Sequence, residues 1–241
     1  MLNMHRSEPN ILITGTPGVG KSMMSSMLSQ RTGLEWLDVS KIAIENECLE
    51  EYDEEYQCSV LDERKLLNSM KGPMSEGGKI VDYHSADFFP ERWIDIVFVL
   101  RTDNTILYDR LKDRGYCGRK LEDNIDCEIF QIILEEAREY YREEIVHELT
   151  NNTPDQMMDN VNRVCQWLEQ WKIDNQQTYA PDRAILISES FPVARSPLRI
   201  TNEFRDSWIP SCSKFPLAFS TRETSNNVKR HLGTLHHGDQ A

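Results

Sequence analysis

The residues best suited to chemistry lie near the amino end, where glycines, a lysine and a serine follow one another at a distinctive spacing. Residues 15–22 read Gly-Thr-Pro-Gly-Val-Gly-Lys-Ser and fit the phosphate-binding pattern G-x-x-x-x-G-K-[ST]. Such a loop points backbone N–H groups at phosphate, which requires the positive φ and the absent Cβ of glycine. Lys21 would reach the β- and γ-phosphates, and the Ser22 hydroxyl would contact Mg²⁺. The motif predicts a nucleoside triphosphate site, and a flexible glycine turn beside a stray lysine is the alternative.

The segments on either side of this loop agree with the prediction. Residues 10–14, Asn-Ile-Leu-Ile-Thr, read as a short buried strand. After the loop, Met24 and Leu28 recur at helical spacing until Gly33 provides a stop. Strand, glycine loop and helix in this order are the context that a phosphate-binding loop requires.

Two further polar side chains follow a short apolar strand expected at residues 79–82. Asp82 ends that strand, where a carboxylate can orient Mg²⁺ and its water. His84 is two residues further on, so an extended chain would point it to the same side as Asp82. There it could position or deprotonate an attacking water during hydrolysis. A solvated aspartate and a structural histidine are the alternative interpretations.

Strand-like and helix-like segments alternate from residue 10 to about residue 172. The expected strands cover residues 10–14, 34–39, 79–82, 94–100 and 145–149. The expected helices are the one after the loop, an acidic stretch that ends at Tyr56, residues 62–74, 104–114 and 124–144, and a last helix capped by Thr153. Such alternation predicts a three-layer α/β fold, in which helices cover both faces of a parallel five-stranded sheet.

Composition excludes several classes of protein. The chain has 241 residues, with 27 Lys and Arg against 40 Asp and Glu, and a formal net charge of −13. A uniformly acidic protein does not bind bare nucleic acid through bulk electrostatics, so any RNA contact would be local. No apolar run approaches the ~18 residues that span a bilayer, and residues 1–9 hold no apolar signal segment. The six cysteines never form C-x-x-C pairs, so we expect reduced thiols and a cytosolic or nuclear protein.

The last part of the chain, residues 174–241, differs from the rest. It contains eight basic and seven acidic residues, five prolines and many Ser, Thr and Asn residues, without a sustained helical or strand period. Only residues 184–187, Ala-Ile-Leu-Ile, look like a strand. We therefore expect one domain over residues 1–173 and a mostly disordered extension over residues 174–241, for which a partner-binding segment is the alternative.

Several short runs are more specific than the phosphate loop. The most telling are Asp-Tyr-His at residues 82–84 and Asp-Phe-Phe-Pro-Glu-Arg-Trp at residues 87–93. Further matching runs are residues 9–21, 52–56, 80–84, 96–103, 114–116, 128–130 and 143–147, and Asn124. On these runs, which span residues 9 to about 172, the chain resembles the adenylate kinase isoenzyme 6 family of P-loop nucleoside monophosphate kinases. The resemblance does not cover the extension.

The resemblance implies an enzyme that moves the γ-phosphoryl group of ATP to AMP, with Mg²⁺ as cofactor, and that also hydrolyses ATP. It further implies a monomer of the nucleus and cytoplasm that acts in assembly of the small ribosomal subunit, including 18S rRNA maturation, and binds a small-subunit ribosomal protein. Two alternatives remain open. One is an ATPase switch that binds such a protein without phosphorylating AMP, and the other is a scaffold that binds no nucleotide.

The resemblance also assigns functional residues to this chain. The ATP-binding positions are Gly18, Gly20, Lys21, Ser22, Met23 and Arg114; the catalytic positions are Lys21, Asp82, His84 and Arg114; and the Mg²⁺ positions are Ser22 and Asp82, partly through water. Arg114 belongs to a lid at residues 113–123, where its guanidinium would offer a forked donor to the transferring phosphate. The alternative for Arg114 is a helix C-terminal arginine that complements the macrodipole.

The acceptor side departs from the family. The resemblance places the AMP-binding segment at residues 38–61, where this chain has Lys41-Ile42-Ala43-Ile44 in place of the relatives' Asp-Leu-Ala-Arg. The arginine expected to grip the AMP phosphate is therefore replaced by Ile44, and Lys41 could substitute only as a point charge. Arg92 and Arg101 are further candidate phosphate ligands, with a surface salt bridge as the favoured interpretation. The acidic run at residues 52–56 would recruit a basic protein or simply form a solvated face.

Overall fold

The computed structural model describes residues 6–53 and 58–178. Its elements, in chain order, are β1 (Ile11–Thr14), α1 (Lys21–Thr32), β2 (Glu35–Asp38), α2 (Val39–Glu45), β3 (Leu49–Asp53), β4 (Cys58–Leu61), α3 (Glu63–Glu76), β5 (Lys79–Asp82), η1 (Glu91–Trp93), β6 (Ile96–Arg101), α4 (Asn104–Asp113), α5 (Gly118–Ile129), α6 (Ile132–Tyr140), η2 (Glu143–Ile145), β7 (Val146–Thr150) and α7 (Pro154–Thr178). None of the helices in these ranges is long and apolar enough to cross a membrane.

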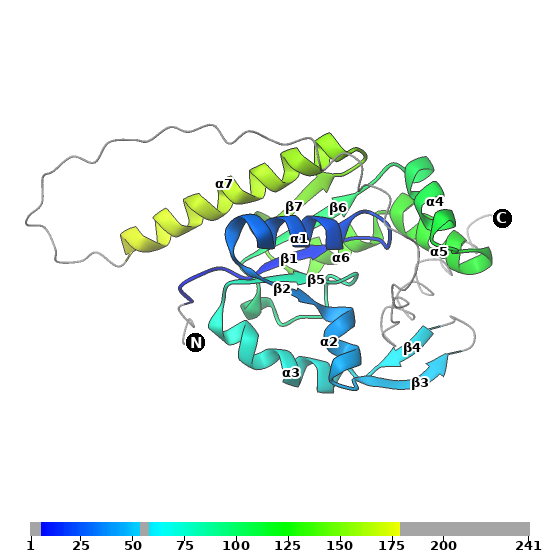
Figure 1. Cartoon of the computed structure of the whole chain (residues 1–241), viewed down its shortest axis with the longest axis horizontal. Coiled ribbons are helices and arrows are strands. Elements are labelled where there is room, and N and C mark those ends of the chain that lie inside the picture. Colours follow the sequence, from blue (N-terminus) through cyan, green and yellow to red (C-terminus); the bar gives the residue numbers. More distant parts are fainter. Residues whose placement is uncertain (1–5, 54–57, 179–241) are drawn as a thin grey trace, which may run out of the picture.

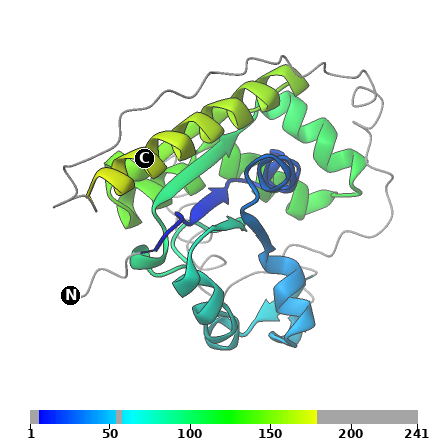
Figure 2. The same cartoon turned by 60° about the vertical axis from the view of Figure 1, so that its left-hand side comes forward.

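One parallel sheet contains five of the strands, in the order β2-β5-β1-β6-β7. This confirms the expected three-layer α/β fold with a parallel five-stranded sheet. In Figures 1 and 2, α7 lies on one side of the sheet, and α2, α3 and the β3–β4 hairpin lie on the other. Because β1 and β5 are central and parallel, their carboxyl ends bring the phosphate loop and Asp82 to the same edge, with Ile13 paired to Asp82 in register.

Side chains that alternate along the central strand enter two separate hydrophobic cores. Leu12 packs in the core shared with α2, α3 and α6, whereas Ile11 and Ile13 pack in the core shared with α1, α4, α5 and α7. Both cores contain fully buried apolar side chains, so the sheet is covered on both faces. The edge that carries the candidate site is therefore held from both sides.

Short polar side chains begin several helices as the sequence suggests. Asp38, Asp62 and Asp103 are the N-caps of α2, α3 and α4, and each accepts a hydrogen bond from a backbone N–H two or three residues on. Thr153 accepts from the Gln156 N–H at 3.2 Å at the start of α7. The Gln156 side chain then accepts from the Asn152 N–H at 2.8 Å, so the predicted cap at Thr153 is part of a variant of the capping box.

The segment expected to be helical up to Tyr56 is only partly so. Helix α2 ends at Glu45, and Glu47 has a φ of 52° before the chain continues into the antiparallel β3–β4 hairpin. The turn places Cys48 in the core, where it is fully buried, and this burial outweighs the helical preference of the acidic residues around it. Tyr56 itself lies outside the described residues.

The helix expected over residues 124–144 is two helices. Helix α5 begins earlier, at Gly118, and ends at Ile129, after which Gln131 adopts a φ of 58° and α6 begins. The segment expected as a polar lid, residues 113–123, is therefore mostly the first half of α5. Helix α7 continues to Thr178, past the expected domain boundary at residue 173. The remainder of the extension, including the strand expected at residues 184–187, lies outside the described residues, so its disorder stays a prediction.

Candidate active site

The phosphate loop joins β1 to α1, and its glycines have conformations that other residues rarely adopt. The φ angles are 134° at Gly15, 95° at Gly18 and 106° at Gly20. A Cβ on Gly15 would collide with the Leu100 backbone carbonyl, and one on Gly20 would lie 2.5 Å from Nδ2 of Asn151. Gly20 is also the N-cap of α1, and no side chain caps that end of the helix. The loop and the first turn of α1 therefore present backbone N–H groups to an anion.

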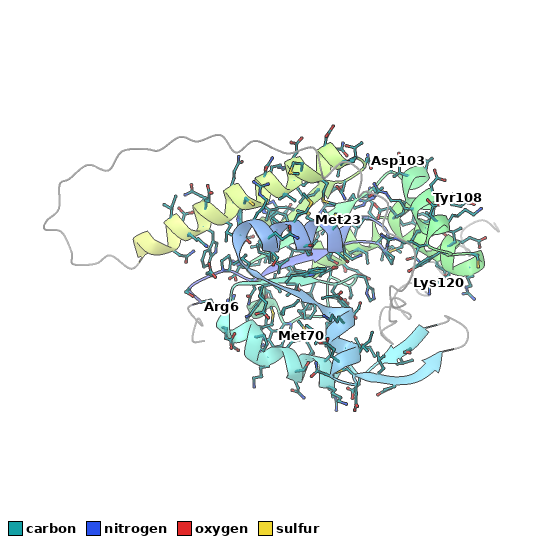
Figure 3. The ribbon with its side chains drawn as sticks, viewed as in Figure 1. Arg6, Met23, Met70, Asp103, Tyr108 and Lys120 are labelled. Carbon is teal, nitrogen blue, oxygen red and sulfur yellow. The ribbon has the colours of Figure 1, made fainter. Side chains whose placement is uncertain are left out.

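Lys21 lies across this loop. Its ammonium donates to the carbonyl oxygens of Gly15 at 2.8 Å and Thr16 at 3.1 Å. Burial lowers the pKa of Lys21 to about 8, against the opposing effect of the Asp82 carboxylate. The side chain is thus cationic at neutral pH and held within the loop that would surround the phosphates. Met23, labelled in Figure 3, lies exposed on the first turn of α1.

Asp82 is buried at the end of β5, with 6% of its surface exposed, so it is not a solvated aspartate. Burial raises its pKa, and Lys21 and a hydrogen bond from Ser22 act in the opposite direction. The structure therefore brings three of the predicted site residues together: Lys21, Ser22 and Asp82. A carboxylate beside a hydroxyl supplies the oxygen ligands that Mg²⁺ prefers when phosphates and waters complete its coordination. This donor set fits Mg²⁺.

His84 lies just beyond the strand. Because β5 ends at Asp82, the alternation that would place His84 directly beside Asp82 does not continue to residue 84. The half-buried imidazole instead packs on the Tyr83 ring, with ring centroids 4.4 Å apart. Tyr83 in turn contacts Phe88 and Phe89, so the loop after β5 is built on an aromatic cluster. A role for His84 in activating water stays a prediction.

Arg114 is the C-cap of α4 and is exposed. Its backbone N–H bonds to the carbonyls of Leu111 and Lys112, which fits the helix C-terminal interpretation. Its charge also lowers the pKa of Lys21. Arg110 on the same helix donates to the Gly18 carbonyl at 3.4 Å, so α4 lies against the phosphate loop. The role of Arg114 in a lid stays a prediction.

Three residues that the sequence analysis did not select also hold the phosphate loop. Asn151, after β7, donates from Nδ2 to the Val19 carbonyl at 2.6 Å. Arg110 of α4 donates to the carbonyls of Gly18 at 3.4 Å and Asn152 at 2.9 Å. Glu128 of α5 accepts from the Thr16 hydroxyl at 2.6 Å. Of the three, Glu128 alone had a signal in the sequence, because it belongs to the run at residues 128–130 that matches the family.

The acceptor side carries little cationic charge. Ile44 is 44% exposed, and the Lys41 ammonium lies 3.7 Å from the Glu45 carboxylate on the same helix. Arg101 is bound to Glu128 and Glu148, which fits the salt-bridge interpretation rather than that of a phosphate ligand.

Among the described residues, no group of three or more His, Cys, Asp or Glu side chains is placed to hold a metal ion.

Comparisons with known proteins identify the family of this chain. A family model described as "AAA domain" matches residues 11–131. Adenylate kinase isoenzyme 6 homologues are similar at 52% identity in Drosophila melanogaster and 48% in Caenorhabditis elegans, over 68% and 69% of this chain and 94% and 93% of those proteins. A gluconokinase structure from Sinorhizobium meliloti is 14% identical, with a TM-score of 0.46, over 73% of this chain and all of that one. The chain therefore belongs to the adenylate kinase isoenzyme 6 family of P-loop nucleoside monophosphate kinases.

Proposed function

We propose that this protein transfers the γ-phosphoryl group of ATP to AMP and hydrolyses ATP when AMP is absent. The observation that carries the ATP half of the proposal is the meeting of Lys21, Ser22 and the buried Asp82 at the phosphate loop. The AMP half rests on the family, whose relatives are named adenylate kinase isoenzyme 6 homologues.

Each residue of the ATP site would act by position and charge. The backbone N–H groups of the loop bind the phosphate oxygens. The Lys21 ammonium, which donates to two loop carbonyls in this structure, donates to the β- and γ-phosphates instead when ATP is bound. Ser22 and Asp82 would hold Mg²⁺, which neutralises charge on the β- and γ-phosphates when it is bound. Arg114, near Lys21, donates to the phosphoryl group during transfer. His84 positions the attacking water in the hydrolytic reaction.

A second function, an ATPase switch without an acceptor nucleotide, is favoured by one observation. Where the family's arginine would grip the AMP phosphate, this chain exposes Ile44, and the neighbouring Lys41 is paired with Glu45. In either case we propose a role in small ribosomal subunit assembly, in the nucleus and cytoplasm, with a small-subunit ribosomal protein as partner. That part of the proposal is supported by the resemblance alone.

One coupled assay separates these functions. ADP formation from Mg·ATP is measured with AMP, dAMP, CMP or UMP and without acceptor, for the wild type and for Lys21→Ala. A rate that depends on AMP supports the kinase, and an equal rate without acceptor supports the switch and contradicts the kinase. Lys21→Ala is expected to remove either activity. No turnover in the wild type would contradict both and leave the scaffold.

A further inference from the structure

Glu128 connects the helix that carries the lid to the phosphate loop. It lies near the end of α5, and only 2% of its surface is exposed. One carboxylate oxygen accepts from the Thr16 hydroxyl at 2.6 Å. The other accepts from Nε of Arg101 at 2.5 Å and from the Thr102 N–H at 3.1 Å. A buried carboxylate bound in this way is fixed by three elements: the loop, the end of β6 and α5 itself.

The same side chain acts on Lys21 by two routes. Thr16, which donates its hydroxyl to Glu128, also supplies one of the two backbone carbonyls that hold the Lys21 ammonium. The charge of Glu128 also raises the pKa of Lys21, against the larger lowering caused by burial. The other charged or titratable groups that act on Lys21 are Asp82 on β5, Arg114 at the end of α4 and Cys127 on α5. Of these, Arg114 lowers the pKa of Lys21, and Asp82 and Cys127 raise it.

A salt bridge that only joined β6 to α5 would not need both oxygens of the Glu128 carboxylate. Arg101 already donates to the Glu128 backbone carbonyl at 2.9 Å and to Oε1 of its carboxylate, so β6 and α5 are joined without Oε2 of Glu128. Oε2 instead accepts from the Thr16 hydroxyl and so fixes the phosphate loop. The cost of burying a carboxylate is therefore offset by contacts directed at the nucleotide site.

We propose that Glu128 is a positioning residue for ATP, which fixes the phosphate loop through the Thr16 hydroxyl. The proposal rests on the proposed function, because it assumes that this loop binds Mg·ATP. Helix α5 would then have two functions. Its first half belongs to the expected lid, and Glu128 near its end fixes the phosphate loop.

The test measures the dissociation constant of Mg·ATPγS, a slowly hydrolysed analogue, at neutral pH in the full chain. Glu128→Gln keeps the shape of the side chain and removes its charge, and Glu139→Gln is the matched control on an exposed position of α6. In Glu128→Gln, binding should weaken about threefold or more, because a neutral amide holds the Thr16 hydroxyl less firmly than a carboxylate does. Glu139→Gln should bind with wild-type affinity.

Thr16→Val provides a second test that does not disturb the pair with Arg101. It replaces the hydroxyl with a methyl group, so binding should weaken about threefold or more. Thr16→Ser, which keeps the hydroxyl, should retain wild-type affinity. Wild-type affinity in both Glu128→Gln and Thr16→Val would overturn the proposal. If Glu128→Gln fails to fold, unchanged affinity in Thr16→Val alone would overturn it. A wild type that does not bind Mg·ATPγS would contradict the proposed function instead, so the two failures are distinguishable.

Discussion

Replacing Gly20 with alanine tests how the phosphate loop is held. At a φ of 106°, an alanine would be strained, which costs roughly 1–2 kcal/mol. Its Cβ would also lie 2.5 Å from Nδ2 of Asn151 and 3.0 Å from Cε of Met157. Because Asn151 would have to move, its 2.6 Å hydrogen bond to the Val19 carbonyl would be lost in a buried place, which costs about 1–3 kcal/mol. We therefore expect Gly20→Ala to lower the free energy of unfolding by about 2–5 kcal/mol.

Gly33→Ala is the control for this substitution. Gly33 ends the same helix at a φ of 77°, but a Cβ there would have no neighbour within 4 Å. Only the backbone strain of roughly 1–2 kcal/mol should appear, and Mg·ATP affinity should not change. Urea unfolding of both variants measures the difference, and calorimetry measures ATP binding, which Gly20→Ala should weaken. Equal losses of stability would refute the argument that Asn151 constrains the loop.

The double variant Gly20→Ala/Asn151→Ala checks the same contact independently. Removing the Asn151 side chain removes the atom that the new methyl group would strike, while its bond to Val19 is lost only once. The loss of stability in the double variant should therefore be smaller than the sum of the two single losses by about 1 kcal/mol or more. Additive losses would show that the two side chains do not interact.

Three further predictions concern ATP binding, turnover and acceptor binding. Wild-type affinity for Mg·ATP should fall as the pH rises through about 8. Burial lowers the pKa of Lys21 to about 8, so above that pH the amine is neutral and attracts phosphate less. Calorimetry between about pH 7 and 9 checks this. Asp82→Asn should lower kcat by about a hundredfold or more with an unchanged circular dichroism spectrum, and a normal rate would remove Asp82 from the mechanism. Ile44→Arg should lower the KM for AMP by about tenfold or more, since a charge-assisted phosphate contact contributes about 1.5–3 kcal/mol; an unchanged KM would show that residue 44 does not reach the acceptor.

The fold was predictable to the extent that local patterns and topology agree. The strand at residues 11–14, the glycine loop and the parallel sheet follow from apolar runs and repeated alternation, which tertiary contacts reinforce. The break at Gln131 was not predictable, because a non-glycine residue with positive φ leaves no signal in the sequence. The β3–β4 hairpin was missed because burial of Cys48 decides the path of the chain there, and its surroundings read as an acidic helix.

The candidate site divides in the same way. Lys21, Ser22 and Asp82 could be found because a motif and a strand end mark them. Asn151 could not, because its bond to the loop joins residues 132 positions apart and nothing local distinguishes it from other polar residues after a strand. Glu128 stands in a run that matches the family, but its bond to Thr16, 112 positions away, leaves no mark in the sequence. Their roles follow only from the topology, which brings the carboxyl ends of β1, β6 and β7 together.

The two halves of the site are therefore under different physical constraints. The ATP half is held by buried groups on several elements, such as Asp82, Glu128 and Asn151, so a substitution there disturbs both the loop and the core. The acceptor half at α2 presents Ile44 and Lys41 on an exposed helix face, where substitutions usually change stability by less than about 0.5 kcal/mol. Under the proposed function, this chain can therefore change its acceptor while its fold and ATP site stay intact. The exposed Ile44 is the residue at which we expect that change to act first.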